Sequence, residues 1–166
     1  MNKYKIRSML RDIRTKVMKN MNHELNPFGL SVNITMTNHL TDRILDRSLR
    51  KDVDIANIEE LLSNLGDHYL GYMMFRCRQD DENQVLLYKT YRNNFQECFA
   101  LGVSMKFSEG VYDLVIRTFI PACRMTYLRE RPNFEIKPPK KKVRLVSPLQ
   151  KMLYSENCPE VLKILR

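Results

Sequence analysis

The chain has 166 residues, which is enough for one domain with an ordinary hydrophobic core and too few for two domains of typical size. Hydrophobic residues make up 43% of it, and this proportion argues against disorder of the whole chain. The formal net charge of +9 favours a polyanionic partner, most commonly a nucleic acid. The alternative is a solvated basic surface without such a partner.

The cysteines give no sign of a zinc module or a disulfide framework, because none of them is part of a C-x-x-C pair or a cluster. They are Cys77, Cys98, Cys123 and Cys158, and we expect reduced, buried thiols. The N-terminus lacks the apolar segment of a signal peptide, and no run of about 18 apolar residues occurs. We therefore expect a cytoplasmic protein that does not interact with a membrane. No cofactor or metal is predicted, since the three histidines lack metal-ligand spacing.

The first predicted element is an amphipathic helix from Lys3 to about Asn22. Its apolar residues recur at offsets of three and four, the period of a helix with one buried side. They are Ile6, Met9, Leu10, Ile13, Val17 and Met21. A second, adjacent face carries Arg7, Arg11 and Arg14. These arginines either form a solvated face or a row of phosphate contacts, because arginines one turn apart can follow a nucleic-acid backbone.

A strand over 31–36 and a second helix capped by Thr37 or Asn38 come next. In this helix His39 and Arg43 lie four residues apart and therefore share one side. An imidazole can move a proton there while a guanidinium holds a phosphate. Asp46 is spaced to pair with either Arg43 or Arg50.

A third helix is expected to begin at an Asp54 cap and to end at Gly66. Its buried stripe is the clearest in the chain and consists of Ile55, Ile58, Leu61, Leu62 and Leu65.

The chain then changes to segments rich in β-branched and aromatic residues, separated by short polar joins. We expect four strands, at 69–78, 84–92, 95–107 and 111–120. Consecutive strands with short joins predict an antiparallel meander. The fold class is therefore α+β, with N-terminal helices packed on a four-stranded antiparallel sheet whose other face is left for a ligand.

The C-terminal part differs in composition. Four of the seven prolines fall within 129–148, together with the basic run Lys140, Lys141, Lys142 and Arg144. This composition predicts a domain over 1–128, a basic Pro-rich linker or arm over 129–148, and a short helical segment over 149–166. The basic run is either a nucleic-acid contact or a solvated charge cluster.

Two stretches carry a resemblance to a known family. Asn38-His39-Leu40-Thr41-Asp42-Arg43 with Asp46-Arg47, and Glu59-Glu60-Leu61-Leu62 leading to Gly66-Asp67-His68, resemble the RegB family of phage endoribonucleases. More distantly the chain is similar to RelE-type ribonuclease toxins. The resemblance implies helices against a four-stranded antiparallel sheet and metal-independent RNA cleavage, in which the ribose 2′-hydroxyl attacks the adjacent phosphate.

Within that resemblance His39 matches the first catalytic histidine and Arg43 the phosphate-stabilising arginine. The family's second histidine corresponds here to Ser63, and serine cannot perform acid–base work near neutral pH. Either His68 takes its place, or a sheet residue does, or catalysis has been lost and RNA binding kept. The sheet candidates are Tyr88, Lys89 and Arg92.

The expected function is an endoribonuclease that prefers certain sequences in mRNA, free or on a ribosome, during phage infection. RNA would contact Arg7, Arg11, Arg14, Arg47, Arg50, Tyr88, Lys89, Arg92, Lys140, Lys141, Lys142 and Arg144. The first alternative is a non-catalytic nucleic-acid-binding regulator on the same scaffold. The second is a phage protein-binding or inhibitor module, for which the charge is incidental.

Overall fold

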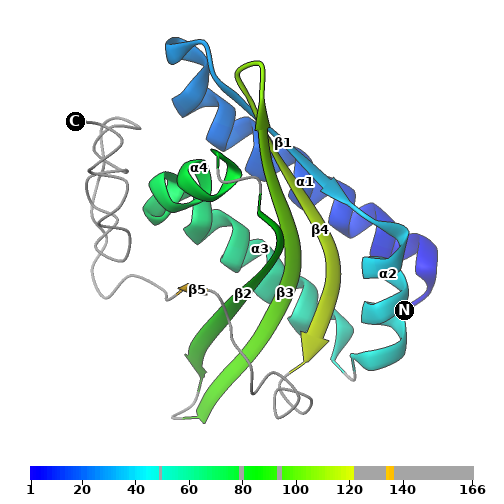
Figure 1. Cartoon of the computed structure of the whole chain (residues 1–166). Coiled ribbons are helices and arrows are strands. Elements are labelled where there is room, and N and C mark those ends of the chain that lie inside the picture. Colours follow the sequence, from blue (N-terminus) through cyan, green and yellow to red (C-terminus); the bar gives the residue numbers. More distant parts are fainter. Residues whose placement is uncertain (49, 79–80, 93–94, 122–133, 137–166) are drawn as a thin grey trace.

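Four α-helices and five strands make up the described part of the chain (Figure 1). The computed structural model describes the backbone of residues 1–48, 50–78, 81–92, 95–121 and 134–136. Within these ranges, the side chains of residues 81–98 and 134–136 are not described. The elements are α1 (Lys3–Leu25), the 3-10 turn η1 (Asn26–Phe28), β1 (Ser31–Met36), α2 (Asn38–Arg47), α3 (Lys51–His68), α4 (Leu70–Arg78), β2 (Asp81–Arg92), β3 (Phe95–Ser108), β4 (Val111–Pro121) and β5 (Phe134–Ile136).

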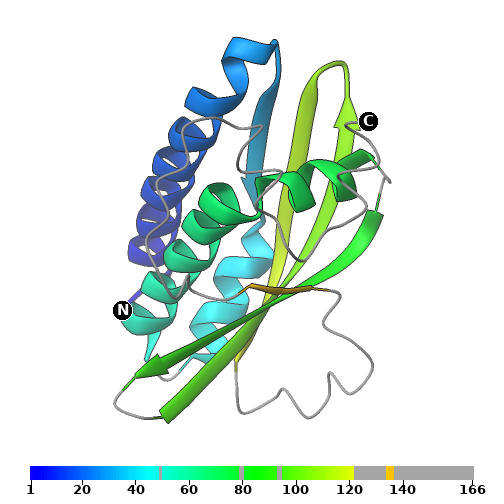
Figure 2. The same ribbon diagram turned by 90° about the vertical axis from the view of Figure 1, so that its left-hand side faces the viewer.

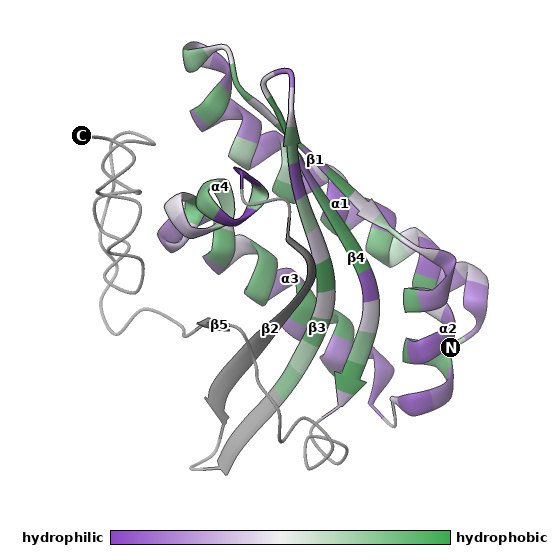
Figure 3. Ribbon diagram, in the orientation of Figure 1, coloured by the Kyte–Doolittle hydropathy of each residue, from purple (hydrophilic) through white to green (hydrophobic). Residues whose placement is uncertain are grey.

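Helix α1 has the predicted buried side, and hydrophobic and hydrophilic residues alternate around it (Figure 3). Asn2 caps its start, because the side chain of Asn2 accepts a hydrogen bond of 2.9 Å from the Lys5 backbone N–H. Its buried residues are Ile6, Leu10, Ile13, Val17, Met21 and Leu25. The arginines follow the same period one step around the helix, so they lie beside this stripe rather than within it.

Helix α2 is capped by Thr37, whose hydroxyl accepts a hydrogen bond of 3.2 Å from the Leu40 N–H. Helix α3 starts at Lys51, earlier than expected, and it continues past Gly66 to His68. The prediction that Gly66 stops this helix is therefore wrong. A Cβ at Gly66 would lie 3.0 Å from Met21 Cγ, so this glycine allows α3 to approach α1 closely.

The largest correction concerns residues 69–78, which were expected to form the first strand of the sheet. They form α4 instead, and Leu70, Met73, Met74 and Cys77 are buried on it. These four positions are spaced i, i+3, i+4 and i+7, the spacing of a helix face. The aromatic and apolar composition of the segment concealed this period, because a fully buried helix and a buried strand are equally apolar.

The predicted four-stranded antiparallel sheet is also wrong. The sheet is mixed and five-stranded in the order β1-β4-β3-β2-β5. The three strands β2, β3 and β4 form the expected antiparallel meander, whereas β1 pairs in parallel with β4 and β5 pairs in parallel with β2. The return of β1 beside β4 depends on contacts between residues about 80 positions apart, from Ser31↔Val111 to Met36↔Ile116.

Helices α1 and α3 lie on one side of the bent sheet (Figure 2). Buried residues from all four helices and from β1, β3 and β4 form one hydrophobic core. The inward side chains of β4 are Tyr112, Leu114 and Ile116, and its residues 111, 113, 115 and 117 are more exposed. The α+β class agrees with the expectation. No helix among the described residues has the length and apolar character to cross a membrane. The expected C-terminal arm and terminal helices lie outside the described residues, apart from β5.

Candidate functional site

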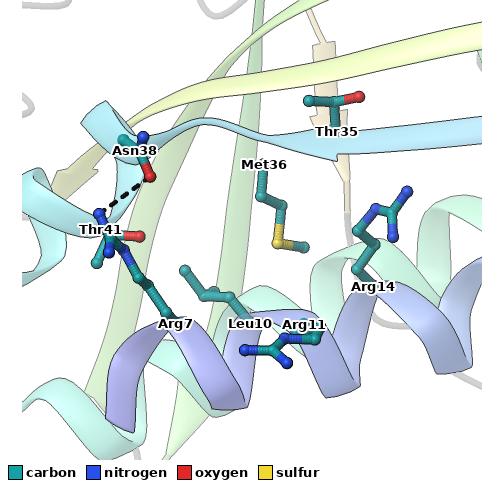
Figure 4. Close-up of a pocket in the computed structure, with 8 residues that line it drawn as sticks. All are labelled: Arg7, Leu10, Arg11, Arg14, Thr35, Met36, Asn38 and Thr41. Atoms are coloured by element: carbon teal, nitrogen blue, oxygen red, sulfur yellow. Dashed lines mark hydrogen bonds between the residues drawn. The ribbon is translucent and has the colours of Figure 1, made fainter. Parts of the chain in front are cut away.

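Three arginines from α1 line a cavity between this helix, the end of β1 and the start of α2 (Figure 4). We call this cavity the arginine groove. Its volume is about 310 Å³, which lies at the lower end of the range for small-ligand pockets. The lining residues are Arg7, Leu10, Arg11, Arg14, Thr35, Met36, Asn38 and Thr41. The arginine row that the helical period predicted therefore faces a hollow rather than open solvent on all sides.

The three guanidinium groups are held differently. Arg7 Nη2 donates a hydrogen bond of 3.1 Å to Asn38 Oδ1, drawn as the dashed line in Figure 4. Arg14 Nε donates to the Ile34 carbonyl. Arg11 is exposed, and no hydrogen bond or ion pair joins it to another residue in the described part of the chain. Arg7 and Arg14 are already oriented by protein groups, so their side chains lose less conformational entropy when an anion binds between them.

The wall of the groove opposite α1 is the outer edge of β1, which is an end strand of the described sheet. In a parallel strand every second residue directs its backbone groups away from the neighbouring strand, and in β1 these residues include Val32 and Ile34. Asn22 of α1 occupies this edge, since it accepts from the Val32 N–H at 2.7 Å and donates to the Val32 carbonyl at 3.2 Å. Arg14 covers the Ile34 carbonyl. Side chains of α1 thus block β1 from pairing with another strand over this stretch.

The His39–Arg43 pair lies next to the groove on α2. Arg43 Nε donates a hydrogen bond of 3.0 Å to His39 Nε2, so the two groups share one side of the helix as predicted. His39 is exposed, and Asn38, its neighbour in sequence, lines the groove. In this arrangement His39 Nε2 accepts the hydrogen bond, and the imidazole lies directly beside the Arg43 guanidinium.

An ion pair joins the starts of α1 and α2. Lys3 Nζ lies 2.6 Å from Asp42 Oδ1. The hydrogen bond from Lys3 holds the pKa of Asp42 below its ordinary value, and the charges of Lys3, Arg7 and His39 act in the same direction. Asp42 therefore remains ionised in this basic cluster. Its negative charge offsets part of the positive potential at this end of the groove.

The structure does not bring His68 to His39. His39 lies near the start of α1, because the adjacent Asn38 contacts Arg7. His68 ends α3, and its neighbour Asp67 lines a hollow with Lys19. The rise of 1.5 Å per residue separates positions 7 and 19 of α1 by about 18 Å. His39 and His68 therefore lie beside parts of α1 that are this far apart, and we do not expect one scissile phosphate to contact both imidazoles.

Ser63, where the resemblance places a second histidine, also lies away from His39. It lines a hollow between α1 and α3 with Lys16 and Asn20. This part of α1 is about 14 Å further along the helix than Arg7. A histidine at position 63 would therefore face α1 and would not complete the site either.

The remaining predicted RNA contacts are scattered or outside the described side chains. Arg47 is half-buried, and its Nη1 donates a hydrogen bond of 3.3 Å to the Phe119 carbonyl, which ties α2 to the end of β4. Arg50 is exposed at the start of α3. The side chains of Tyr88, Lys89 and Arg92 on β2 are not described, and neither are Lys140, Lys141, Lys142 and Arg144.

The sequence did not reveal three residues that shape the site. The sequence indicates Asn38 only as a possible helix cap, whereas its side chain orients Arg7 from 31 positions away. Lys3 and Asn22 mark only the ends of the first predicted helix, although they contact α2 and β1. No local signal could have identified these contacts, because each one joins different elements.

Comparisons of the sequence with protein families and with characterised proteins, and of the fold with solved structures, give no match. Among the described residues no group of three or more His, Cys, Asp or Glu side chains is arranged to hold a metal ion. The site is therefore interpreted from its own geometry.

Proposed function

We propose that this protein binds the phosphodiester backbone of RNA in the arginine groove. The observation that carries the proposal is that Arg7, Arg11 and Arg14 all line one cavity. Each guanidinium can donate two parallel hydrogen bonds to phosphate oxygens, and it keeps its charge at any physiological pH. The net charge of +9 supports the same class of partner, because it attracts polyanions over long distances.

The start of α2 adds to the positive potential of the groove. Asn38 and Thr41 lie in the first turns of this helix and line the cavity. The unpaired N–H groups and the dipole at a helix N-terminus favour an anion. A phosphate in the groove would thus contact guanidinium groups of α1 and lie close to the first turns of α2.

The direct test is RNA binding by an Arg11→Gln variant. Arg11 is exposed and supports no other described residue, so its replacement should leave the fold intact. Lys19→Gln removes the same charge from an exposed position about 12 Å further along α1 and serves as the matched control. We expect Arg11→Gln to weaken binding and to reduce the slope of log K against log salt by about 0.7, the contribution of one phosphate contact in a single strand. Equal effects of the two variants would show only nonspecific charge attraction.

A second candidate function is metal-independent cleavage of the bound RNA. The hydrogen bond between Arg43 and His39 favours it, because it places an exposed imidazole beside a guanidinium, and these are the kinds of group that 2′-hydroxyl attack on a phosphate requires. The resemblance to RegB-type ribonucleases suggests the same two residues. An acid for the leaving oxygen would have to come from a residue other than His68 or Ser63.

Labelled RNA incubated in chelator separates the candidates. Fragments with cyclic phosphate ends that disappear in His39→Ala would support the nuclease. Salt-sensitive retention without cutting would support the non-catalytic regulator. Neither result would be expected for a protein-binding or inhibitor module. The setting that we propose is the cytoplasm, during phage infection, with mRNA as the RNA that is bound, free or on a ribosome.

A further inference from the structure

One aromatic side chain near the start of α1 stands almost fully in solvent. Tyr4 of α1 is 80% exposed. Two other large hydrophobic residues of the described chain are exposed, Phe28 at 59% and Met1 at 46%. A tyrosine that buries so little of its ring adds almost nothing to the hydrophobic core. Its surface is therefore available to a partner.

The position of Tyr4 on α1 aligns it with the groove. Tyr4 precedes Arg7 by three residues and Arg11 by seven, so all three lie on one side of the helix. Seven residues correspond to almost two full turns, and the Cα atoms of Tyr4 and Arg11 are separated by a rise of about 10 Å. The ring is thus placed at the end of the arginine row that is nearest the N-terminus.

We propose that Tyr4 is a stacking platform for an unpaired base, and that the arginine groove therefore binds single-stranded RNA in preference to a duplex. This inference rests on the proposed function. In a duplex the faces of the bases are covered by their neighbours, whereas a single strand can turn a base outward onto an aromatic ring while its phosphates follow a basic groove. The small volume of the groove, about 310 Å³, suits a short backbone segment.

The test compares Tyr4→Ala, Tyr4→Phe and Phe28→Ala with the wild-type chain. Phe28 provides the matched control, because it is an exposed aromatic residue beyond the other end of α1. The probes are a single-stranded RNA, a duplex RNA of the same length, and inorganic polyphosphate, which has no bases. Circular dichroism of each variant verifies the fold.

We expect Tyr4→Ala to weaken single-stranded RNA binding by about 5- to 150-fold, the range typical for loss of one stacked base. Tyr4→Phe and Phe28→Ala should bind as the wild type does, and polyphosphate binding should not change in any variant. The wild type should prefer the single strand to the duplex.

Three results would overturn the inference while the proposed function stands: undiminished RNA binding by Tyr4→Ala, an equal loss of RNA and polyphosphate binding in that variant, or equal affinity of the wild type for single strand and duplex. If the wild type bound none of the three probes, the proposed function itself would be wrong, and this inference with it.

Discussion

A glycine in the middle of the sheet allows a sharp test of the packing between β3 and β4. Gly102 lies opposite Thr118, and the register between the two strands shifts immediately after Gly102. A Cβ at Gly102 would lie 2.7 Å from Thr118 Cγ2. Carbon atoms in van der Waals contact are about 3.5–4.0 Å apart. The side chain of Thr118 is branched at Cβ and stiff, so it cannot move aside without strain.

The change to make is Gly102→Ala. Overpacking of this kind lowers the free energy of unfolding by about 1–3 kcal/mol. Alanine in a strand is favoured over glycine by about 0.5–1 kcal/mol, because glycine loses more backbone entropy on folding. The net loss should be up to about 2.5 kcal/mol, which corresponds to a fall in Tm of up to several degrees for a chain of this length.

The same substitution should have the opposite effect once the obstructing methyl group is absent. In a Thr118→Ala background, Gly102→Ala should raise the free energy of unfolding by about 0.5–1 kcal/mol, since only the entropy term remains. Urea unfolding of the four proteins measures both differences in one double-mutant cycle. An identical effect of Gly102→Ala in the two backgrounds would refute the packing explanation.

Three further predictions concern the contacts between elements. Asn22→Asp keeps an acceptor for the Val32 N–H but sets a carboxylate against the Val32 carbonyl, so the free energy of unfolding should fall by about 1–3 kcal/mol; an unchanged urea midpoint would contradict this. Because Lys3 lowers the pKa of Asp42, the stabilisation from this pair should be present above pH about 4 and be lost as the pH falls through the lowered value. Asp42→Asn should therefore lower Tm at pH 7 but not near pH 2, and a pH-independent difference would argue against the ion pair. Burial raises the pKa of the Cys77 thiol to about 12, so little reactive thiolate is present at pH 8. Alkylation of Cys77 at this pH, followed by mass spectrometry, should be at least about 100-fold slower in the folded than in the urea-unfolded protein. Similar rates in the two states would contradict this expectation.

Several elements could be predicted because their signal is local. The buried stripes of α1 and α3 both follow the period of 3.6 residues; in α1, for example, Leu10 and Val17 lie seven residues, or about two turns, apart. The residue types predict a cap at Thr37 or Asn38, and the structure has it at Thr37. That His39 and Arg43 share one side of α2 follows from their spacing of four residues, which a helix converts into proximity whatever surrounds it.

Other features failed because competing structures have the same local pattern. Residues 70–77 are apolar almost throughout, and only their burial against the core decides between helix and strand. In sequence, Gly66 is typical of a helix end. In the structure it lies within α3, where the absence of a side chain allows close packing against Met21. The partner of β1 could not be inferred, because parallel pairing with β4 brings together segments about 80 residues apart.

The sequence by itself determined that α1 carries its arginines on one side and that α2 joins an imidazole to a guanidinium, because helix geometry converts spacing into direction within a few residues. Only the tertiary structure decided that Arg7 meets Asn38 and that the arginines face a groove at the sheet edge. It also decided that His68 lies far from His39. These relations depend on how α1, α3 and β1 pack together, and packing is a property of the whole core that no short stretch of sequence encodes.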